Sequence, residues 1–257
     1  MIVNGTRLQP DAAGALYWPD EQMLVVSDMH FEKASAYARR GLGLAPPLDS
    51  RINMDRLTAL LDRYRPARLL SLGDSFHDAE AWSRLTHAEQ ARLCHLAERQ
   101  ETIWISGNHD PDLPADLPGI IAMEYVRGPL LFRHEPTADA HPGEVAGHLH
   151  PKARVHARGR NVSAPCFASD GLRLVMPAFG AFTGGLDVTD AAFRPLFPRP
   201  FHAWMCVNGA VHAIPSRRLV QRTTRPARAP GRQVAADQTA SSSPAAASSS
   251  SQADRFL

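Results

Sequence analysis

The sequence predicts a protein of the α/β class, and three features of the chain support this. Short apolar runs at residues 23–26, 69–72 and 102–105 lack polar alternation and are rich in branched side chains, which is typical of buried strands. Longer amphipathic stretches separate these runs, as helices do between strands of one sheet. Beyond Gly119 the strand-like pieces become shorter and are broken by Gly, Pro and Asn-Gly turns, which indicates a second, more antiparallel sheet packed on the first.

Two helices are expected between the apolar runs. Asp49 is the candidate N-cap of the first, which continues to about Tyr64 and ends before Pro66. The residues expected on its buried side are Ile52, Leu57, Leu60, Leu61 and Tyr64. Thr86 caps the second helix, which runs to about Arg99 with Leu93 and Leu96 facing inward. In the second half of the chain, strands are expected at residues 120–126, 130–133, 154–157, 172–175 and 203–207.

The composition suits one catalytic domain with a tail. The 257 residues are 44% hydrophobic and 21% charged, enough for one sizeable core, which we assign to residues 1–222. Residues 223–257 are rich in Ser, Ala and Pro, cannot offset the entropy of ordering, and are predicted to be disordered. The net charge of +2 gives no sign that the whole chain binds polyanions, and we attribute most of the arginine excess to genome composition.

Cysteine usage and the start of the chain bear on location. Cys94, Cys166 and Cys206 are far apart and form no CxxC pair, which argues against a disulfide framework or a zinc ribbon. No basic stretch followed by an apolar core opens the chain, and no run of about 18 apolar residues occurs in it. We therefore expect no membrane segment and a cytoplasmic location.

Metal-binding residue types directly follow five strand-like segments. Residues 25–27 lead into Asp28 and His30, residues 70–72 into Gly73-Asp74, and residues 104–106 into Gly107-Asn108-His109-Asp110. Two later segments end in the same way, at His134 and at Gly147-His148-Leu149-His150. Because ligands bind beyond the carboxyl ends of strands in α/β sheets, these five positions are expected to meet in one cleft.

The spacing of these residues suits metal binding. In an extended stretch side chains alternate, so Asp28 and His30 are expected to point to the same side, and His148 and His150 likewise. A glycine before a ligand permits a tight turn or a close approach of the backbone to a cation. Carboxylate, imidazole and amide oxygen together suit manganese, iron or zinc better than calcium. Each motif alone also has an ordinary explanation as a turn or a solvated loop, but the five in this order favour a metal site.

The order Asp-x-His, Gly-Asp, Gly-Asn-His-Asp, His, Gly-His-x-His resembles the calcineurin-like metallophosphoesterases, over residues 28–150. The resemblance implies a four-layer αββα sandwich of two mixed β-sheets flanked by helices, and a site for two divalent metal ions. It implies that Asp28, His30, Asp74 and His150 hold one ion, that Asp74, Asn108, His134 and His148 hold the other, and that Asp74 bridges them.

A narrower resemblance covers roughly residues 20–210. The segments SDMHFEK (27–33), GDSFH (73–77), GHLHP (147–151) and MPAFGAFTGG (176–185) are similar to the bacterial ligase-associated DNA damage response endonuclease branch. This similarity implies a manganese-dependent nuclease or phosphodiesterase that acts on DNA beside a DNA ligase and a helicase, with no membrane partner. Phe179 and Phe182 lie in the last segment, where packing on the core is favoured over stacking on a base.

Three residues are candidates for catalysis rather than for metal binding. His109, next to the ligand Asn108, is expected to donate a proton to the leaving oxygen. Many members of the superfamily carry an acidic residue three positions after the bridging Asp, where this chain has His77 followed by Asp78. Asp78 is thus a candidate for orienting His109, His77 for contacting the substrate phosphate, and Asp110 for supporting the ligands from behind.

These expectations leave two alternative functions open. The same ligands serve a phosphatase or a small-nucleotide phosphodiesterase, and a retired site would leave a metal-binding scaffold without turnover. The full set of ligands together with His109 argues against the scaffold.

Overall fold

The computed structural model describes residues 1–42, 48–139, 142–157 and 159–220. The chain divides into two units, residues 1–222 and residues 223–257. The tail that was predicted to be disordered, residues 223–257, lies outside the described residues. All described elements belong to the first unit.

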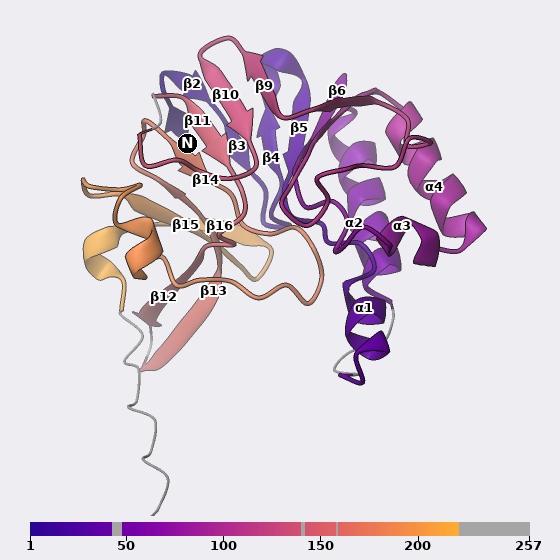
Figure 1. The fold of residues 1–257 in the computed structure, drawn as a ribbon. Helices are drawn as coiled ribbons and strands as arrows, with labels where there is room; N and C mark the ends of the chain where they lie inside the picture. The colour runs from indigo at the N-terminus through magenta and orange to yellow at the C-terminus, as the bar shows by residue number, and fades with distance from the viewer. Residues whose placement is uncertain (43–47, 140–141, 158, 221–257) are drawn as a thin grey trace, which may run out of the picture. The chain divides into compact units, whose positions relative to one another are not determined.

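The first sheet contains the three apolar runs that were predicted as buried strands. In spatial order its strands are β3 (Gln9–Pro10), β4 (Leu16–Trp18), β5 (Met23–Val26), β6 (Arg68–Leu72), β7 (Glu101–Ile105) and β8 (Ile120–Ala122). Strands β5 to β8 are parallel to one another. Strand β4 is antiparallel to both β3 and β5, so the sheet is mixed. The prediction of strands at β5, β6 and β7 is confirmed. Strand β6 pairs with both of the others, and Figure 1 shows it beside β5.

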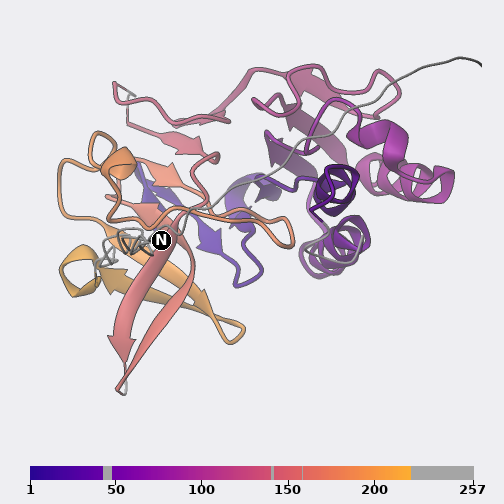
Figure 2. The ribbon, with the colours of Figure 1, turned by 60° about the horizontal axis from the view of Figure 1, so that its bottom comes forward.

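The second sheet is formed by the latter half of the chain. Its order is β16 (Ala210–Pro215), β15 (His202–Val207), β13 (Arg160–Ser169), β14 (Leu174–Val175), β11 (Glu144–Ala146), β10 (Leu130–Arg133) and β9 (Glu124–Arg127), with β12 (Lys152–Ala157) paired to β13. Strands β10, β11 and β14 are parallel and the other pairs are antiparallel, so this sheet is mixed as well. The hairpin of β12 and β13 projects away from the sheet (Figure 2), and β1 (Ile2–Val3) with β2 (Thr6–Arg7) forms a separate small hairpin.

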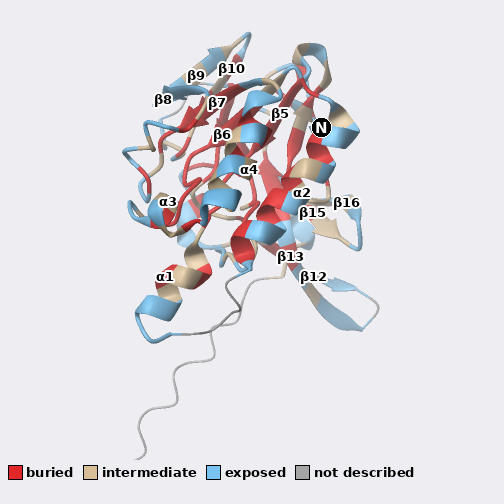
Figure 3. Cartoon of the chain, turned by 90° about the vertical axis from the view of Figure 1, so that its right-hand side faces the viewer, coloured by how far each residue is buried: buried red, intermediate tan, exposed pale blue. Residues whose placement is uncertain are grey.

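Helices cover the outer face of the first sheet. The α-helices of the described residues are α1 (Lys33–Arg39), α2 (Asp49–Tyr64), α3 (Ala81–Arg84) and α4 (His87–Glu98), and the 3-10 helices are η1 (Pro19–Glu21), η2 (Ala191–Phe193) and η3 (Ser216–Arg218). The buried sides of α2 and α4 face the sheet and their exposed sides face outward (Figure 3). Within the described part of the chain, none of these helices combines the length and the hydropathy that crossing a membrane requires.

The start of α4 was predicted correctly and the start of α2 was not. The Thr86 hydroxyl accepts from the Glu89 N–H at 3.3 Å, and the Glu89 carboxylate accepts from the Thr86 N–H at 2.9 Å, so both ends of a capping box are present. Asp49, in contrast, is the first residue of α2 rather than its N-cap. Its carboxylate accepts the Ala34 N–H of α1 at 2.9 Å, so it joins two helices instead of capping one. Ile52, predicted on the buried side, is 36% exposed.

Three apolar clusters separate four layers. On β5, Leu24 and Val26 pack toward the helices, while Met23 and Val25 face the second sheet, as the alternation along a strand requires. The outer face of the second sheet is covered by a segment that contains η2 and contributes Phe193, Leu196 and Phe197. The predicted sandwich of two mixed sheets between two outer layers is confirmed, with a mostly irregular segment and η2 as the fourth layer.

The predicted strand at residues 120–126 is divided in the structure. Its first part is β8 in the first sheet, and its second part is β9 in the second sheet. The chain passes from one sheet to the other at Met123, which is 73% exposed. No Gly or Pro marks this crossing, so the single strand was the wrong prediction.

Candidate metal centre

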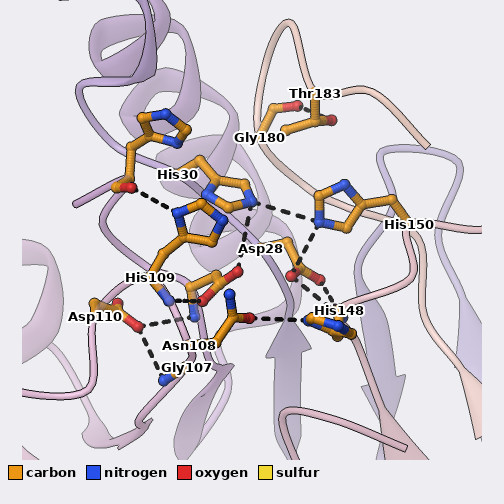
Figure 4. Close-up of polar contacts among 12 residues, drawn as sticks. Asp28, His30, Gly107, Asn108, His109, Asp110, His148, His150, Gly180 and Thr183 are labelled. Carbon is orange, nitrogen blue, oxygen red and sulfur yellow. Dashed lines mark hydrogen bonds and ion pairs between the residues drawn. The ribbon is translucent and has the colours of Figure 1, made fainter. Parts of the chain in front are cut away.

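Five loops at the carboxyl ends of strands form the centre. They follow β5, β6 and β7 of the first sheet and β10 and β11 of the second, and each sheet holds these strands parallel, so their ends lie at one edge. The predicted ligands on these loops, all of which the structure brings together, are Asp28, His30, Asp74, Asn108, His134, His148 and His150 (Figure 4 labels five of them).

The backbone of these loops is not extended, which corrects one step of the sequence argument. Asp28, His30, His148 and His150 all have a left-handed φ, between +46° and +67°, and so does Asp74 at +48°. Residues two apart therefore share a site because of tight left-handed turns and not because of strand alternation. Non-glycine residues seldom adopt this conformation, and such strain gathers at functional sites.

The glycines before the ligands make room for other ligands. A Cβ atom on Gly147 would clash with the Ser27 hydroxyl and come within 2.6 Å of Asp28 Oδ2. A Cβ on Gly107 would clash with Asp74 Oδ1, and one on Gly73 with the His134 ring. Close approach is thus the reason for glycine, as predicted, but the partner is a neighbouring ligand side chain.

Asp28, His30 and His150 form the first group of donor atoms. His150 Nε2 lies 3.1 Å from Asp28 Oδ1 and 3.4 Å from His30 Nε2. Asp28 Oδ2 accepts from the Ser27 hydroxyl at 2.5 Å and from the His148 N–H at 3.1 Å. The carboxylate is therefore held from behind while Oδ1 faces the imidazoles.

Asp74, His134 and His148 form the second group, and Asn108 belongs with them. His134 Nε2 lies 3.3 Å from Asp74 Oδ1. Asn108 Oδ1 lies 3.0 Å from His134 Nε2 and 2.9 Å from His148 Nδ1. His134 Nδ1 bonds the Leu72 carbonyl at 3.0 Å, so this nitrogen carries the proton and Nε2 presents its lone pair to the group.

Asp74 lies between the two groups. Its Oδ1 faces His134, and its Oδ2 lies 3.8 Å from His30 Nε2 in the other group. The Oδ1 atom also accepts the His109 N–H at 2.9 Å. One carboxylate oxygen thus points toward each group.

The protonation states of His30, His148 and Asp74 suit ligands, whereas His134 must give up a proton to bind a cation. Burial lowers the pKa of His30 to about 3 and also lowers the pKa of His148, so both imidazoles are neutral. Burial alone would raise the pKa of Asp74, but a hydrogen bond and charge from His134 hold it at about 2. Burial opposes protonation of His134, yet its hydrogen bond to Asp74 and the charges of Asp28 and Asp74 raise its pKa to about 9. That shift reports a negative potential, which favours a cation.

The donor set fits two divalent cations. The nitrogen and carboxylate atoms of each group lie within 4.8 Å of one another, and none of these residues carries a thiolate. His30 Nδ1 is buried without a hydrogen-bond partner among the described residues, so only Nε2 is engaged, on the side of the group. Each position is surrounded by two imidazoles and the shared Asp74 carboxylate, with the Asp28 carboxylate added at the first and the Asn108 amide oxygen at the second. This mixed oxygen and nitrogen environment is typical of manganese, iron or zinc.

His109 is exposed and sits beside both groups. Its ring lies 5.1 Å from the His30 ring and stacks on the His77 ring at 5.1 Å. Its Nδ1 bonds the His77 carbonyl oxygen at 2.8 Å. The contact that orients His109 therefore comes from the backbone of His77, and not from Asp78 as expected, because both Asp78 oxygens accept from Arg84 at 2.7 and 3.0 Å.

His77 is buried between Tyr37 and His109 and joins His30 and His109 in a third group of donor atoms.

Asp110 supports the centre through the backbone. Its carboxylate accepts the N–H groups of Gly107 at 2.9 Å, Asp74 at 3.1 Å and Phe76 at 2.9 Å, and burial raises its pKa to about 7.

Sequence reasoning missed the residues that hold the loops from outside the motifs. Asn53 of α2 donates to the Met29 carbonyl and accepts the Ala181 N–H, each at 2.8 Å, and is fully buried. It thereby joins the loop of Asp28 to residues 177–185. A polar residue within the apolar face of a helix was the signal in the sequence.

The family follows from a comparison with known proteins. The model of the calcineurin-like phosphoesterase family matches residues 22–175. The chain belongs to the calcineurin-like phosphoesterase family. It is therefore a hydrolase of phosphate esters, a metallophosphoesterase, and the side chains gathered here are the candidates for its metal ligands.

One solved structure agrees with this membership. The crystal structure of the Pseudomonas putida nuclease MPE is 30% identical, with a TM-score of 0.64 over 83% of this chain and 98% of that chain. The E. coli phosphoesterase YfcE is 14% identical with a TM-score of 0.37, over 75% of this chain and 97% of that one, a likeness too low to argue from. No curated protein matches the chain significantly.

Proposed function

We propose that this phosphoesterase is a nuclease that hydrolyses DNA phosphodiesters with two divalent cations. The expected metal is manganese, and iron or zinc are the alternatives. The observation that carries the proposal is the pair of donor groups, Asp28 with His30 and His150 and Asp74 with His134 and His148, with an Asp74 oxygen facing each. The similarity to a Pseudomonas putida nuclease over 98% of its length supports the substrate class.

Charge balance favours an anionic substrate. Asp28 and Asp74 bring two negative charges to the centre, since the pKa of each is lowered although burial opposes this. Two divalent cations would leave the centre with a net positive charge, which suits a phosphodiester. When bound, the cations would polarise the phosphoryl oxygens and lower the pKa of water.

The residues of the chain would then position the substrate and move the proton. His109 Nδ1–H donates to the His77 carbonyl, which fixes the ring. In the imidazolium form Nε2–H would then give its proton to the leaving oxygen, and a neutral imidazole that keeps its Nδ1 proton would remain. His77, packed against His109, is proposed to contact the substrate phosphate. Asn108 places an amide oxygen between His134 and His148, and Asp110 holds the loop of Asn108 by its bond to Gly107.

Two variants test the assignment of roles. Asp74→Asn is expected to abolish tight manganese binding and activity together, because it weakens both donor groups. His109→Ala is expected to bind manganese as the wild type does and to lose about 10²–10⁴-fold in rate. Isothermal titration with manganese and initial rates measure the two properties; full activity of the metal-loaded His109→Ala protein would refute the role of His109.

A substrate panel tests the nuclease assignment. The manganese-loaded protein is assayed on bis-p-nitrophenyl phosphate, p-nitrophenyl phosphate, cyclic nucleotides, and single-stranded, nicked and duplex DNA. We expect cleavage of the diester and of DNA to exceed that of the monoester. A preference for the monoester would assign a phosphatase, a preference for cyclic nucleotides a small-nucleotide phosphodiesterase, and no turnover with bound metal a scaffold.

We further propose a role in DNA repair in the cytoplasm, beside a DNA ligase and a helicase. The motif similarity of residues 27–33 and 176–185 to the ligase-associated endonuclease branch supports this context. The test compares the sensitivity to DNA damage of three strains, which lack this protein, the ligase or both. Additive sensitivity in the double deletion would contradict a shared pathway.

A further inference from the structure

A loop of residues 177–185 lies against the metal centre. The Phe179 N–H donates to the Ser27 carbonyl at 2.7 Å, and the Gly180 N–H donates to the Asp28 carbonyl at 3.0 Å. A Cβ on Gly180 would clash with the Met29 carbonyl, so the loop is in direct contact with the backbone of the first donor group. Figure 4 shows Gly180 and Thr183 of this loop on the side of His150.

A cavity of about 220 Å³ opens between this loop and the metal centre. Its lining includes His150, Lys152, Gly180, Phe182 and Thr183. Arg56 also borders it, but its guanidinium donates to the Phe179 and Ala13 carbonyls at 2.6 and 2.5 Å and is engaged in the fold. His150 belongs both to the cavity lining and to the first donor group, so the cavity adjoins the metal centre at this residue.

The two phenylalanines of the loop differ in their surroundings. Phe179 is fully buried under the Arg56 guanidinium, which confirms packing on the core. Phe182 is 56% exposed, which contradicts that prediction, and its φ is +58°. A bulky side chain in this conformation is a rare outlier, and strain of this kind gathers at ligand sites. Packing within the chain does not explain Phe182, whereas an aromatic partner from a ligand would.

The chain has two lysines among its 28 basic residues, and both lie near the metal centre. Lys33 follows His30 by three positions and Lys152 follows His150 by two. Burial lowers the pKa of the Lys33 ammonium, the charges of Asp49, Asp28 and Asp74 oppose this, and the charge of Lys152 adds to it.

The Lys152 side chain is held in place by the loop, but no carboxylate of the residues that the structure describes neutralises its charge. Its ammonium donates to the Thr183 carbonyl at 3.5 Å, and its stem runs beside Gly185, where a Cβ would come within 2.9 Å of Cε. Neither Lys152 nor Lys33 forms an ion pair with any carboxylate in the described part of the chain. An unpaired ammonium beside a cavity at a phosphoesterase centre suits a phosphate oxygen.

We propose that this cavity binds the nucleotide adjoining the scissile phosphodiester in a single-stranded nucleic acid, with the Phe182 ring stacked on its base and the Lys152 ammonium on a phosphate. The proposal rests on the proposed nuclease function and adds its substrate class. An unpaired base presents its face to an aromatic side chain, whereas a base in a duplex does not, so the subsite selects single strands.

Comparing substrates with and without bases tests the role of Phe182. Rates with manganese are measured on oligothymidylate and on an abasic oligonucleotide of the same length, and the ratio of the two kcat/KM values is taken for each protein. We expect Phe182→Ala to lower this ratio about tenfold, since the loss of one base stacked on an aromatic side chain corresponds to roughly 5–150-fold. Phe182→Trp is expected to keep the ratio and Phe182→Leu to lose it.

Leu186→Ala is the matched control, because Leu186 is 40% exposed near the same loop and lies outside the cavity lining. It is expected to keep the wild-type ratio. A ratio that Phe182→Ala leaves unchanged, or that Phe182→Leu restores, overturns the stacking role. Loss of folding would lower both rates together and leave the ratio intact, so it does not imitate the expected result.

Salt dependence tests Lys152. The logarithm of kcat/KM on oligothymidylate, measured below KM, is plotted against the logarithm of salt concentration. Each phosphate contact on a single strand contributes a slope of about −0.7, so Lys152→Ala is expected to make the slope shallower by about that amount and Lys152→Arg to retain it. An unchanged slope in Lys152→Ala overturns the phosphate contact.

The failures of the two proposals are distinguishable. A wild-type protein that cleaves oligothymidylate and the abasic strand equally well supports the nuclease and refutes the subsite. A wild-type protein that cleaves duplex DNA but neither strand supports the nuclease and refutes the subsite. A wild-type protein that hydrolyses bis-p-nitrophenyl phosphate but neither strand and no nicked or duplex DNA refutes the nuclease and the subsite with it.

Discussion

At the residue scale, Gly147 stands where no other side chain fits. A Cβ there would clash with the Ser27 hydroxyl and meet Asp28 Oδ2 at 2.6 Å, both of which are fully buried. We expect Gly147→Ala to lower the free energy of unfolding by about 1–3 kcal/mol through overpacking. It should also weaken manganese binding, because Asp28 must move. Urea unfolding and isothermal titration measure the two effects.

Gly184→Ala is the control for this prediction. No atom lies within 4 Å of a Cβ added at Gly184, and its φ is not in the left-handed region. This variant is expected to match the wild type in stability and in manganese affinity. Equal behaviour of the two alanine variants would show that the contact at Asp28 does not limit the site.

A second prediction at the residue scale concerns His77. Its neutral imidazole makes the stability of the metal-free protein depend on pH. Burial, assisted by the charges of Lys33 and His109, lowers the pKa of His77 to about 4. A depressed pKa means that the unfolded chain takes up a proton near pH 6.5 that the folded chain refuses. This contribution to stability is present above pH 6.5 and is lost as the pH falls toward 4.

His77→Phe removes this titration. The free energy of unfolding of the metal-free protein is measured by urea denaturation at several pH values. Between pH 6.5 and 4 the wild type is expected to lose up to about 1.4 kcal/mol per pH unit more than His77→Phe does. Parallel curves for the two proteins would show that His77 is protonated in the fold.

At the element scale, α2 does more than cover the sheet, because Asn53 bonds two loops of the centre. Its amide donates to the Met29 carbonyl and accepts the Ala181 N–H. Asn53→Ala leaves the Met29 carbonyl buried and unsatisfied, so we expect a loss of about 1–3 kcal/mol, with a smaller loss from the half-buried Ala181 N–H. We also expect weaker manganese binding, because the Met29 carbonyl lies between Asp28 and His30. Thermal unfolding and titration with manganese measure both.

Thr86→Ala is the control for Asn53→Ala, because it weakens a helix that does not contact the centre. It removes the capping box of α4 and is expected to cost about 0.5–2 kcal/mol of stability. Manganese affinity should stay that of the wild type, since α4 donates no residue to the donor groups. A similar loss of affinity in both variants would mean that stability alone explains the effect of Asn53→Ala.

Elements also set the limit of what the sequence predicts. Apolar runs fixed β5, β6 and β7, and the residues after them named the ligands, because burial and metal chemistry both leave local patterns. The crossing at Met123 has no local signal, since only pairing with distant strands decides where β8 ends and β9 begins. Asp49 likewise looks like a cap until α1 supplies a donor. Sequence patterns therefore predicted the side chains of the centre better than the backbone contacts that hold them.

At the scale of the whole molecule, the first unit contains every residue of the centre, and this leads to a prediction about the tail. The family model ends at residue 175, and the Pseudomonas putida nuclease matches over 98% of its length within 83% of this chain. We expect deletion of residues 223–257 to leave the melting temperature and the hydrolysis of bis-p-nitrophenyl phosphate at their wild-type values. Differential scanning calorimetry and initial rates measure them.

The same deletion tests whether the tail contributes to DNA binding. Residues 223–257 include Arg225, Arg228 and Arg232, so the tail carries positive charge that a DNA backbone attracts. If these arginines bind DNA, the truncated protein will show a shallower salt dependence on oligothymidylate while its rate on the small diester is unchanged. If the first unit alone receives the strand through Lys152 and Lys33, both properties will match the full chain. A fall in the rate on the small diester would contradict the assignment of the whole catalytic domain to residues 1–222.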